Sequence, residues 1–204
     1  MSRPVIGFAG MTHLGLNSAV AAAERGFAVM GFDQNGGVID ALQRGNLPVV
    51  EPGLPELFAK NLARVSLTSR ASDLAECHVV YIATDVPTDG QGQSDLTGIR
   101  ALIETVSSVL AGDAILVILC QVPPGFTRNL SFPKKQLYYQ VETLIFGRAV
   151  ERALHPERFI IGCADPKAAL LKPLAEFLSA FECPILPMRY ESAELAKISI
   201  NCCL

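Results

Sequence analysis

The sequence of 204 residues predicts an α/β fold, a doubly wound, mostly parallel sheet of the Rossmann type followed by the start of a long helix. Three observations support this prediction. Short apolar runs alternate with helical patterns along the chain, a glycine-containing turn joins the first run to the first helix, and the second run ends in an acid. Half of the residues, 50%, are hydrophobic and only 18% are charged, so a sizeable core can be buried.

The N-terminal part predicts a strand, a turn, a helix and a second strand. Residues 4–10 form an apolar run with a glycine end, which is typical of a buried parallel strand. The alanine-rich residues 14–26 predict a helix that Gly26 closes. Residues 27–33 predict the second strand, and residues 36–46 a short helix that Gly45 stops.

The middle of the chain continues the alternation. Residues 48–69 predict a loop with two prolines, a helix, and a strand at 65–69. Residues 73–88 hold a short helix and a strand at 78–84, and residues 95–112 predict a helix with Asp95 as its candidate N-cap. A buried strand at 114–120 then leads into the loop 121–127.

The C-terminal part predicts strands at 136–143, 158–163 and 184–189, and a helix over 165–181 with Pro166 in its first turn. Alternating strands and helices with short connections favour parallel pairing. Residues 190–204 have helical character but end on an apolar Cys-Cys-Leu without a cap. We therefore expect a Rossmann-type domain at 1–189, the start of a central helix at 190–204, and a chain truncated at Leu204.

Composition excludes several classes of function. The net charge is −3 with a pI of about 5.6, and no basic run offers the clustered cations that nucleic acid requires. No apolar run approaches the roughly 20 residues of a membrane span, and the N-terminus does not resemble a signal peptide. The six cysteines form no CxxC pair, so we expect no metal site and reduced thiols in a cytoplasmic protein.

The first turn has the span of a dinucleotide-binding fingerprint. Its residues are Gly10, Met11, Thr12, His13, Leu14 and Gly15. Thr12 stands where the second glycine is usual, so a Cβ lies on the path of the phosphate oxygens, although its hydroxyl can donate to one of them. Asp33 ends the second strand 18 residues after Gly15, near the spacing of an acid that binds the adenosine ribose, which favours NAD over NADP. The alternative is a doubly wound domain whose turn contains glycines but binds no nucleotide.

Six stretches carry a resemblance to a known family. They are GMTHLGL, EPGL, DVPT with SDLTGI, CQVPPGFTR, VETLIFGRAVERALHPERFIIG and SAELAKISIN. In the same order along the chain, they resemble the motifs GxGYVGL, EPGL, VPTP…DL, STVPPGT, PEFLxEGxAxxDxxxPDRIVIG and AELxKLxxN of the UDP-glucose/GDP-mannose dehydrogenase family. The resemblance covers almost the whole chain.

The resemblance implies the NAD-binding part of a nucleotide-sugar 6-dehydrogenase, similar to UDP-glucose 6-dehydrogenase. Members of this family oxidise a sugar C6 alcohol through the aldehyde to the acid with two NAD, as in polysaccharide biosynthesis. They dimerise through the central helix, and a later domain supplies a catalytic cysteine and binds the nucleotide. The implied partners are therefore a nucleotide-sugar substrate and, in the full-length protein, a second copy of the chain, with no nucleic acid and no membrane.

Residue by residue, the resemblance implies two sets of site residues. Glu142 matches a water-positioning or general-base glutamate, and Lys197 and Asn201 match the catalytic Lys and Asn, which lie four residues apart on one helix face. The expected cofactor-binding residues are Gly10, Met11, Thr12, His13, Leu14, Gly15, Asp33, Thr84, Val86, Thr88 and Gln121.

The chain also departs from the family pattern. Gln121 replaces a threonine, Phe146 replaces a glutamate, and Val141 and Thr143 replace a proline and a phenylalanine. The catalytic-cysteine motif would lie beyond Leu204, so we expect that this segment alone cannot complete the oxidation. Two alternatives stay open: another NAD-dependent dehydrogenase of the 2-hydroxyacid or 6-phosphogluconate type, and a non-enzymatic NAD-binding module.

Overall fold

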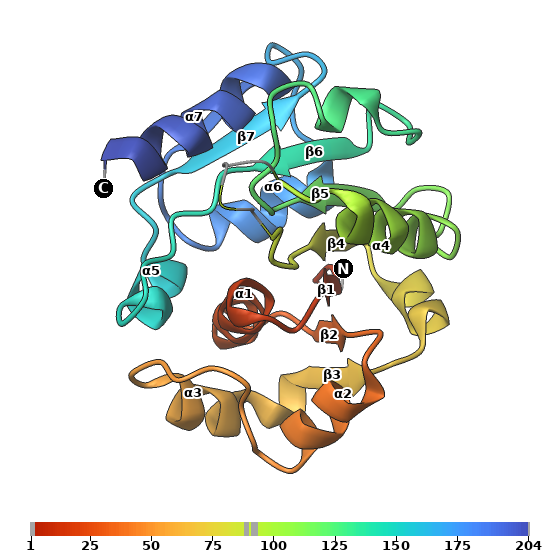
Figure 1. Ribbon diagram of the computed structural model, residues 1–204. Coiled ribbons are helices and arrows are strands. Elements are labelled where there is room, and N and C mark those ends of the chain that lie inside the picture. Colours follow the sequence, from red (N-terminus) through yellow and green to blue (C-terminus); the bar gives the residue numbers. More distant parts are fainter. Residues whose placement is uncertain (1–2, 88–89, 91–93, 204) are drawn as a thin grey trace.

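The computed structural model describes residues 3–87, 90 and 94–203, and it contains one eight-stranded sheet with the strand order β3-β2-β1-β4-β5-β6-β7-β8 (Figure 1). The strands are β1 (Ile6–Ala9), β2 (Val29–Phe32), β3 (Val65–Thr68), β4 (Val79–Ile82), β5 (Ile115–Ile118), β6 (Leu137–Gln140), β7 (Phe159–Cys163) and β8 (Ile185–Arg189). Every expected strand is present, and the predicted fold class is confirmed.

The sheet is parallel except where β6 meets β7, which run antiparallel with Tyr139 opposite Gly162. The sheet is therefore mostly parallel, as predicted, but the sequence did not indicate which pair of strands runs antiparallel. The connection from β6 to β7 re-enters the sheet at the edge where β6 ends, so no helix has to carry the chain back across the sheet.

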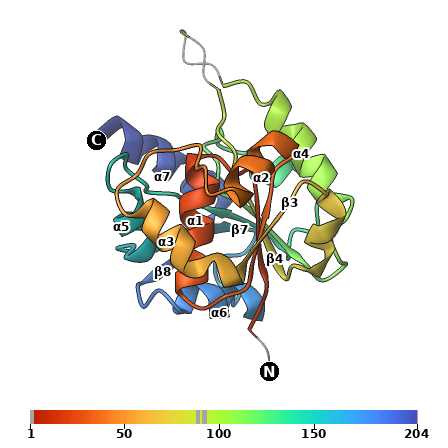
Figure 2. The ribbon, with the colours of Figure 1, turned by 90° about the horizontal axis from the view of Figure 1, so that it is seen from below.

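Helices cover both faces of the sheet. They are α1 (His13–Glu24), α2 (Gly36–Gln43), α3 (Leu54–Asn61), α4 (Thr97–Ser107), α5 (Ala149–Leu154), α6 (Lys172–Ser179) and α7 (Tyr190–Cys203). The two views place α1, α3 and α5 on one side of the sheet and α4 on the other (Figures 1 and 2). Helix α7 packs against β7, β6 and β8.

The core consists of two clusters separated by the sheet, and β4 shows how its residues divide between them. Val79 and Tyr81 belong to the cluster that includes α1 and α6, while Val80 and Ile82 belong to the cluster that includes α4 and α7. Successive side chains of a strand point to opposite faces. A strand buried on both faces is therefore apolar throughout, which is why the sequence shows continuous apolar runs.

Two local predictions differ from the structure. The helix expected over residues 165–181 begins only at Lys172, with Pro173 in its first turn, and Pro166 belongs to a turn in which the Asp165 carboxylate accepts the Lys167 N–H. This local hydrogen bond competes with helix formation. Helix α5 was not predicted, because its six residues are too few to show a helical period.

The described part of the chain has no helix with the length and apolar character needed to cross a membrane. Within the same residues, no group of three or more His, Cys, Asp or Glu side chains is placed to hold a metal ion.

Two buried tyrosines, Tyr139 and Tyr190, differ in whether their hydroxyl group has a hydrogen-bond partner. The hydroxyl of Tyr190, at the start of α7, lies 2.7 Å from the carbonyl oxygen of Leu137 and so ties the helix to β6. Tyr139 in β6 is equally buried, but no described residue lies within hydrogen-bonding distance of its hydroxyl.

We predict that Tyr190→Phe lowers the free energy of unfolding by about 1–2 kcal/mol, because it leaves a buried carbonyl without its donor. Tyr139→Phe is the matched control and should change stability by less than about 0.5 kcal/mol or raise it, since it removes an unpaired buried hydroxyl. Urea unfolding measures both. Equal losses in the two variants would contradict the assigned role of the Tyr190 hydroxyl.

Candidate functional site

The turn between β1 and α1 requires two of its glycines. Gly10 has a φ of +101°, a conformation that side chains disfavour. A Cβ on Gly15 would lie 1.8 Å from the carbonyl oxygen of Gly10, so only glycine lets the helix start this close to the turn. The structure therefore supports the register from Gly10 to Gly15 that the sequence suggested.

Thr12 leaves the start of α1 open. Its hydroxyl donates to the carbonyl oxygen of Ala83 at 3.1 Å and so turns toward the end of β4. No side chain in the described part of the chain caps the first turn of α1. The first backbone N–H groups of a helix have no partner within the helix and attract anions. Thr12 can thus replace glycine while these groups stay available to a phosphate.

Asp33 lies beside this turn, one strand away. Its Oδ2 accepts the N–H of Met11 at 2.9 Å, and its Oδ1 accepts the N–H of Asn35 at 2.9 Å. A carboxylate has about four lone-pair positions, so each oxygen can accept a further hydrogen bond. The glycine turn, the uncapped helix start and the fixed carboxylate together fit a dinucleotide, with its pyrophosphate at α1 and a ribose at Asp33.

A pocket opens at the carboxyl ends of the central strands. Its lining residues are His13, Leu14, Thr84, Asp85, Val86, Ser94, Cys120, Gln121, Glu142, Leu144 and Phe146. Six of the residues that the sequence suggested are among them, from both the cofactor and the catalytic set. Thr88 lies outside the described residues. Ligands of open parallel sheets bind at this edge.

The three expected catalytic residues meet beside this pocket. The Lys197 ammonium forms an ion pair with the Glu142 carboxylate and donates to Oδ1 of Asn201 at 3.0 Å. The side chains of Lys197 and Glu142 are only 6% and 18% exposed. Asn201 in turn donates to Oε1 of Gln121 at 2.6 Å. An ammonium can stabilise a developing oxyanion, and a carboxylate can accept a proton.

Glu194 holds the loop that carries Gln121, a role that the sequence did not suggest. This fully buried carboxylate of α7 accepts the N–H of Gly125 and, at 2.8 Å, the N–H of Thr127. The bonds fasten the loop after β5 to the helix that carries Lys197. Glu194 lies within the stretch SAELAKISIN, which was the available signal.

Glu51 is a second buried carboxylate that the sequence left without a role, although EPGL drew attention to it. Its side chain is fully buried and accepts the N–H groups of Gly147 and Ala149, at 2.9 and 3.3 Å. It also lies 2.7 Å from Nε2 of His13. The His13 ring stacks on Phe146, with ring centroids 4.2 Å apart, and Phe146 is 81% exposed. Glu51 thus fixes one wall of the pocket.

The electrostatics of Glu51 follow from these contacts. Burial by itself raises the pKa of this carboxyl, but the hydrogen bonds from Gly147, His13 and Ala149 outweigh it and hold the pKa below its ordinary value. For Cys120, at the same edge of the sheet, the effect of burial prevails and the pKa is raised. Burial raises the pKa of its thiol to about 12, so it stays protonated and is no nucleophile.

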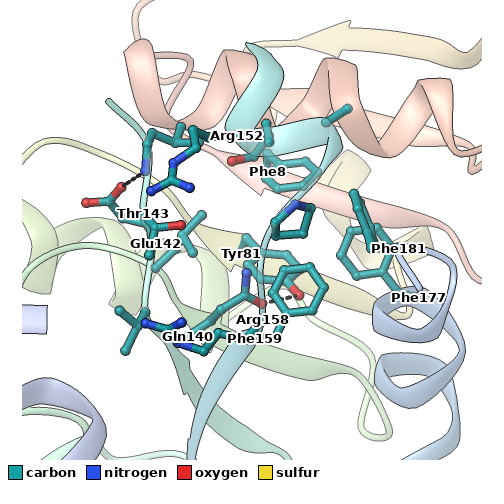
Figure 3. Close-up of a pocket in the computed structure, with 17 residues that line it drawn as sticks. Phe8, Tyr81, Gln140, Glu142, Thr143, Arg152, Arg158, Phe159, Phe177 and Phe181 are labelled. Atoms are coloured by element: carbon teal, nitrogen blue, oxygen red, sulfur yellow. Dashed lines mark hydrogen bonds between the residues drawn. The ribbon is translucent and has the colours of Figure 1, made fainter. Parts of the chain in front are cut away.

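Glu142 and Leu144 also line a second pocket, on the face of the sheet that α1 and α6 cover. On its floor the Tyr81 hydroxyl donates to Oε1 of Gln140 at 3.1 Å. Figure 3 shows the rings of Phe177 and Phe181 on one side and Glu142, Thr143 and Arg152 on the opposite side. The segment after β6 therefore separates two pockets, and packing on both sides sets the position of Glu142.

Comparison with known proteins gives one consistent family. The model described as "UDP-glucose/GDP-mannose dehydrogenase family, NAD binding domain" matches residues 5–180. UDP-glucose 6-dehydrogenase of Pseudomonas aeruginosa is 32% identical over 209 residues, which cover 94% of this chain and 46% of that protein. UDP-glucose 6-dehydrogenase YwqF of Bacillus subtilis is 30% identical over 204 residues, with 94% and 46% covered. The chain spans about half the length of these relatives.

Solved structures agree with this result. A UDP-glucose dehydrogenase from Pyrobaculum islandicum superposes with a TM-score of 0.87 at 27% identity, covering 98% of this chain and 49% of that one. UDP-D-ManNAc dehydrogenase from Pyrococcus horikoshii gives a TM-score of 0.87 at 25% identity, with 97% and 50% covered.

We predict that Glu51→Gln lowers the free energy of unfolding at pH 7 by roughly 1–3 kcal/mol, because a charge-assisted acceptor becomes a neutral amide in a buried site. A lowered pKa stabilises the fold above the ordinary value of 4.5 and loses this effect as the pH falls through the folded-state pKa. The variant should therefore differ most from the wild type near neutrality and least in acid. Urea unfolding at both pH values measures the difference.

The exposed Glu104→Gln on α4 is the control and should leave stability within about 0.5 kcal/mol of the wild type at both pH values. A Glu51→Gln variant that behaves like this control would show that the buried carboxylate does not hold the pocket wall.

Proposed function

Because the chain belongs to the UDP-glucose/GDP-mannose dehydrogenase family, we propose that it is the NAD-binding part of a nucleotide-sugar 6-dehydrogenase. The observation that carries this proposal is the meeting of Glu142, Lys197 and Asn201 beside the pocket at the start of α1. NAD is the cofactor of the matched domain. The relatives and solved structures named above are nucleotide-sugar dehydrogenases, so the 2-hydroxyacid and 6-phosphogluconate alternative is not favoured.

The cofactor would lie across the carboxyl edge of the sheet. The backbone from Met11 to Gly15 would bind the pyrophosphate, and Asp33 the adenosine ribose. The nicotinamide half would then extend away from Asp33 and into the pocket. Thr84, Val86 and Gln121, which line the pocket, would flank it there.

The residues of this chain would act on the sugar next to the cofactor. Bound NAD supplies the acceptor for a hydride from the C6 carbon. Glu142 takes the proton of the C6 hydroxyl, directly or through water, and the Lys197 ammonium stabilises the negative charge that develops on the oxygen. Asn201 holds Lys197 from the other side. The step from aldehyde to acid requires groups outside these 204 residues.

The proposal extends to the organisation of the protein. Residues 1–189 form the cofactor domain, and residues 190–204 begin a helix that leads to the rest of a cytoplasmic enzyme. A homodimer of the full-length protein through this helix is part of the proposal and rests on the family resemblance.

The activity is tested in the longer protein that contains this chain, by following NADH formation with UDP-glucose, GDP-mannose and UDP-N-acetylmannosamine. We predict that one of them is oxidised and that Lys197→Met lowers kcat by about 100-fold or more, because the oxyanion loses its cation. NAD affinity should stay within about twofold of the wild type, as this ammonium contributes to the reaction step rather than to cofactor binding. No turnover with any of these sugars, or full turnover in the variant, would refute the proposed function.

The cofactor site is tested separately. We predict that Asp33→Asn weakens NAD binding by about tenfold or more, because a charge-assisted hydrogen bond to the ribose is lost. NADP binding should weaken less or improve, since a 2′-phosphate no longer meets a carboxylate. Calorimetry measures both cofactors, with the exposed Asp40→Asn on α2 as the control. Unchanged NAD affinity in Asp33→Asn would show that this carboxylate does not contact the ribose.

A further inference from the structure

The hydrogen bonds around Lys197 have only one consistent direction. An ammonium group donates and cannot accept, so the atom of Asn201 that faces Lys197 must be its carbonyl oxygen, Oδ1. The amide nitrogen of Asn201 then faces the other way and donates to Gln121. Gln121 must therefore present its own carbonyl oxygen. The charge on Lys197 thus sets the orientation of two amides in a row.

Gln121 is held in place independently of this bond. The residue before it, Cys120, is buried and its thiol donates to the carbonyl oxygen of Ile82. Farther along the loop, Glu194 accepts the N–H groups of Gly125 and Thr127. Gln121 therefore starts from a fixed backbone, whereas Asn201 is an exposed residue near the end of α7.

The bond between Gln121 and Asn201 is therefore a second anchor for the Asn201 side chain. Without an acceptor at Gln121, the exposed Asn201 side chain keeps only its contact with Lys197 and is free to leave it for solvent. The Lys197 ammonium would then pair with the Glu142 carboxylate alone. This pairing would occupy the carboxylate that is proposed to accept the proton, and it would leave the ammonium less well oriented.

We propose that Gln121 is a positioning residue. Its Oε1 fixes the Asn201 amide, so that Oδ1 of Asn201 stays on the Lys197 ammonium and shares it with Glu142. With Glu142 and Asn201 as its two partners, the Lys197 ammonium keeps a third N–H that can donate to an oxygen of a ligand. The effect on turnover rests on the proposed function, while the orientation of the Asn201 amide does not.

Two substitutions of similar length separate this role from a simple contact with the cofactor. Gln121→Glu keeps an oxygen acceptor for Asn201, and Gln121→Met removes it. In the longer protein we expect Gln121→Met to lower kcat about tenfold with the KM for NAD within about twofold, since one oriented hydrogen bond typically accounts for a factor of this size. Gln121→Glu keeps the acceptor and should lose less kcat than Gln121→Met. The exposed Gln43→Met on α2 is the control and should match the wild type.

A second measurement needs no substrate. The side-chain amide signals of Asn201 are followed by ¹⁵N NMR in the wild type and both variants. We expect these signals to stay shifted in Gln121→Glu and to move to free-amide values in Gln121→Met.

Equal kcat losses in the two variants, or a raised KM for NAD with unchanged kcat, would overturn the proposal. An Asn201 amide signal unaffected by Gln121→Met would overturn it too. If no nucleotide sugar is oxidised, the proposed function fails, and the NMR comparison still decides whether Gln121 orients Asn201.

Discussion

A buried ammonium group determines how the candidate site is built. The Lys197 side chain is 6% exposed, and a charge removed from water must be paired and hydrogen-bonded. Glu142, which follows β6, supplies the countercharge, and Asn201 on the same helix supplies a neutral acceptor. The end of β6 and the helix α7 are thereby held together. Because the ammonium only donates, the same charge also orients the amides that continue toward β5.

Two other buried charges position the loops around this site. Glu51 accepts backbone N–H groups after β6 and contacts the first residue of α1, and Glu194 accepts backbone N–H groups after β5. Loops at the edge of an open sheet have few hydrogen bonds of their own, so a buried carboxylate that collects their N–H groups restricts them strongly. The loops that border the candidate site therefore have little freedom, which preorganisation requires.

The turn before α1 shows how a departure from a motif can be accommodated. Thr12 replaces a glycine that usually keeps side chains away from the phosphate. Its hydroxyl finds an acceptor in Ala83 on the neighbouring strand, so it does not cap the helix. The two positions where a Cβ is sterically excluded or strained, Gly10 and Gly15, keep glycine. The turn thus keeps its backbone geometry, and a non-glycine residue is tolerated at position 12, where neither a positive φ nor a close contact excludes a Cβ.

The sequence by itself determined the sheet, its strands, the register of the first turn and the grouping of Lys197 with Asn201, because each depends on periodicity or on residues near one another in the chain. It did not reveal the antiparallel pairing of β6 and β7, the short helix α5 or the late start of α6. It also did not reveal that Gln121 bonds to Asn201, or that Glu51 supports His13 and Phe146. Only the tertiary structure decided the β6–β7 pairing and these side-chain contacts, since they join residues far apart in sequence whose spacing carries no periodic signal.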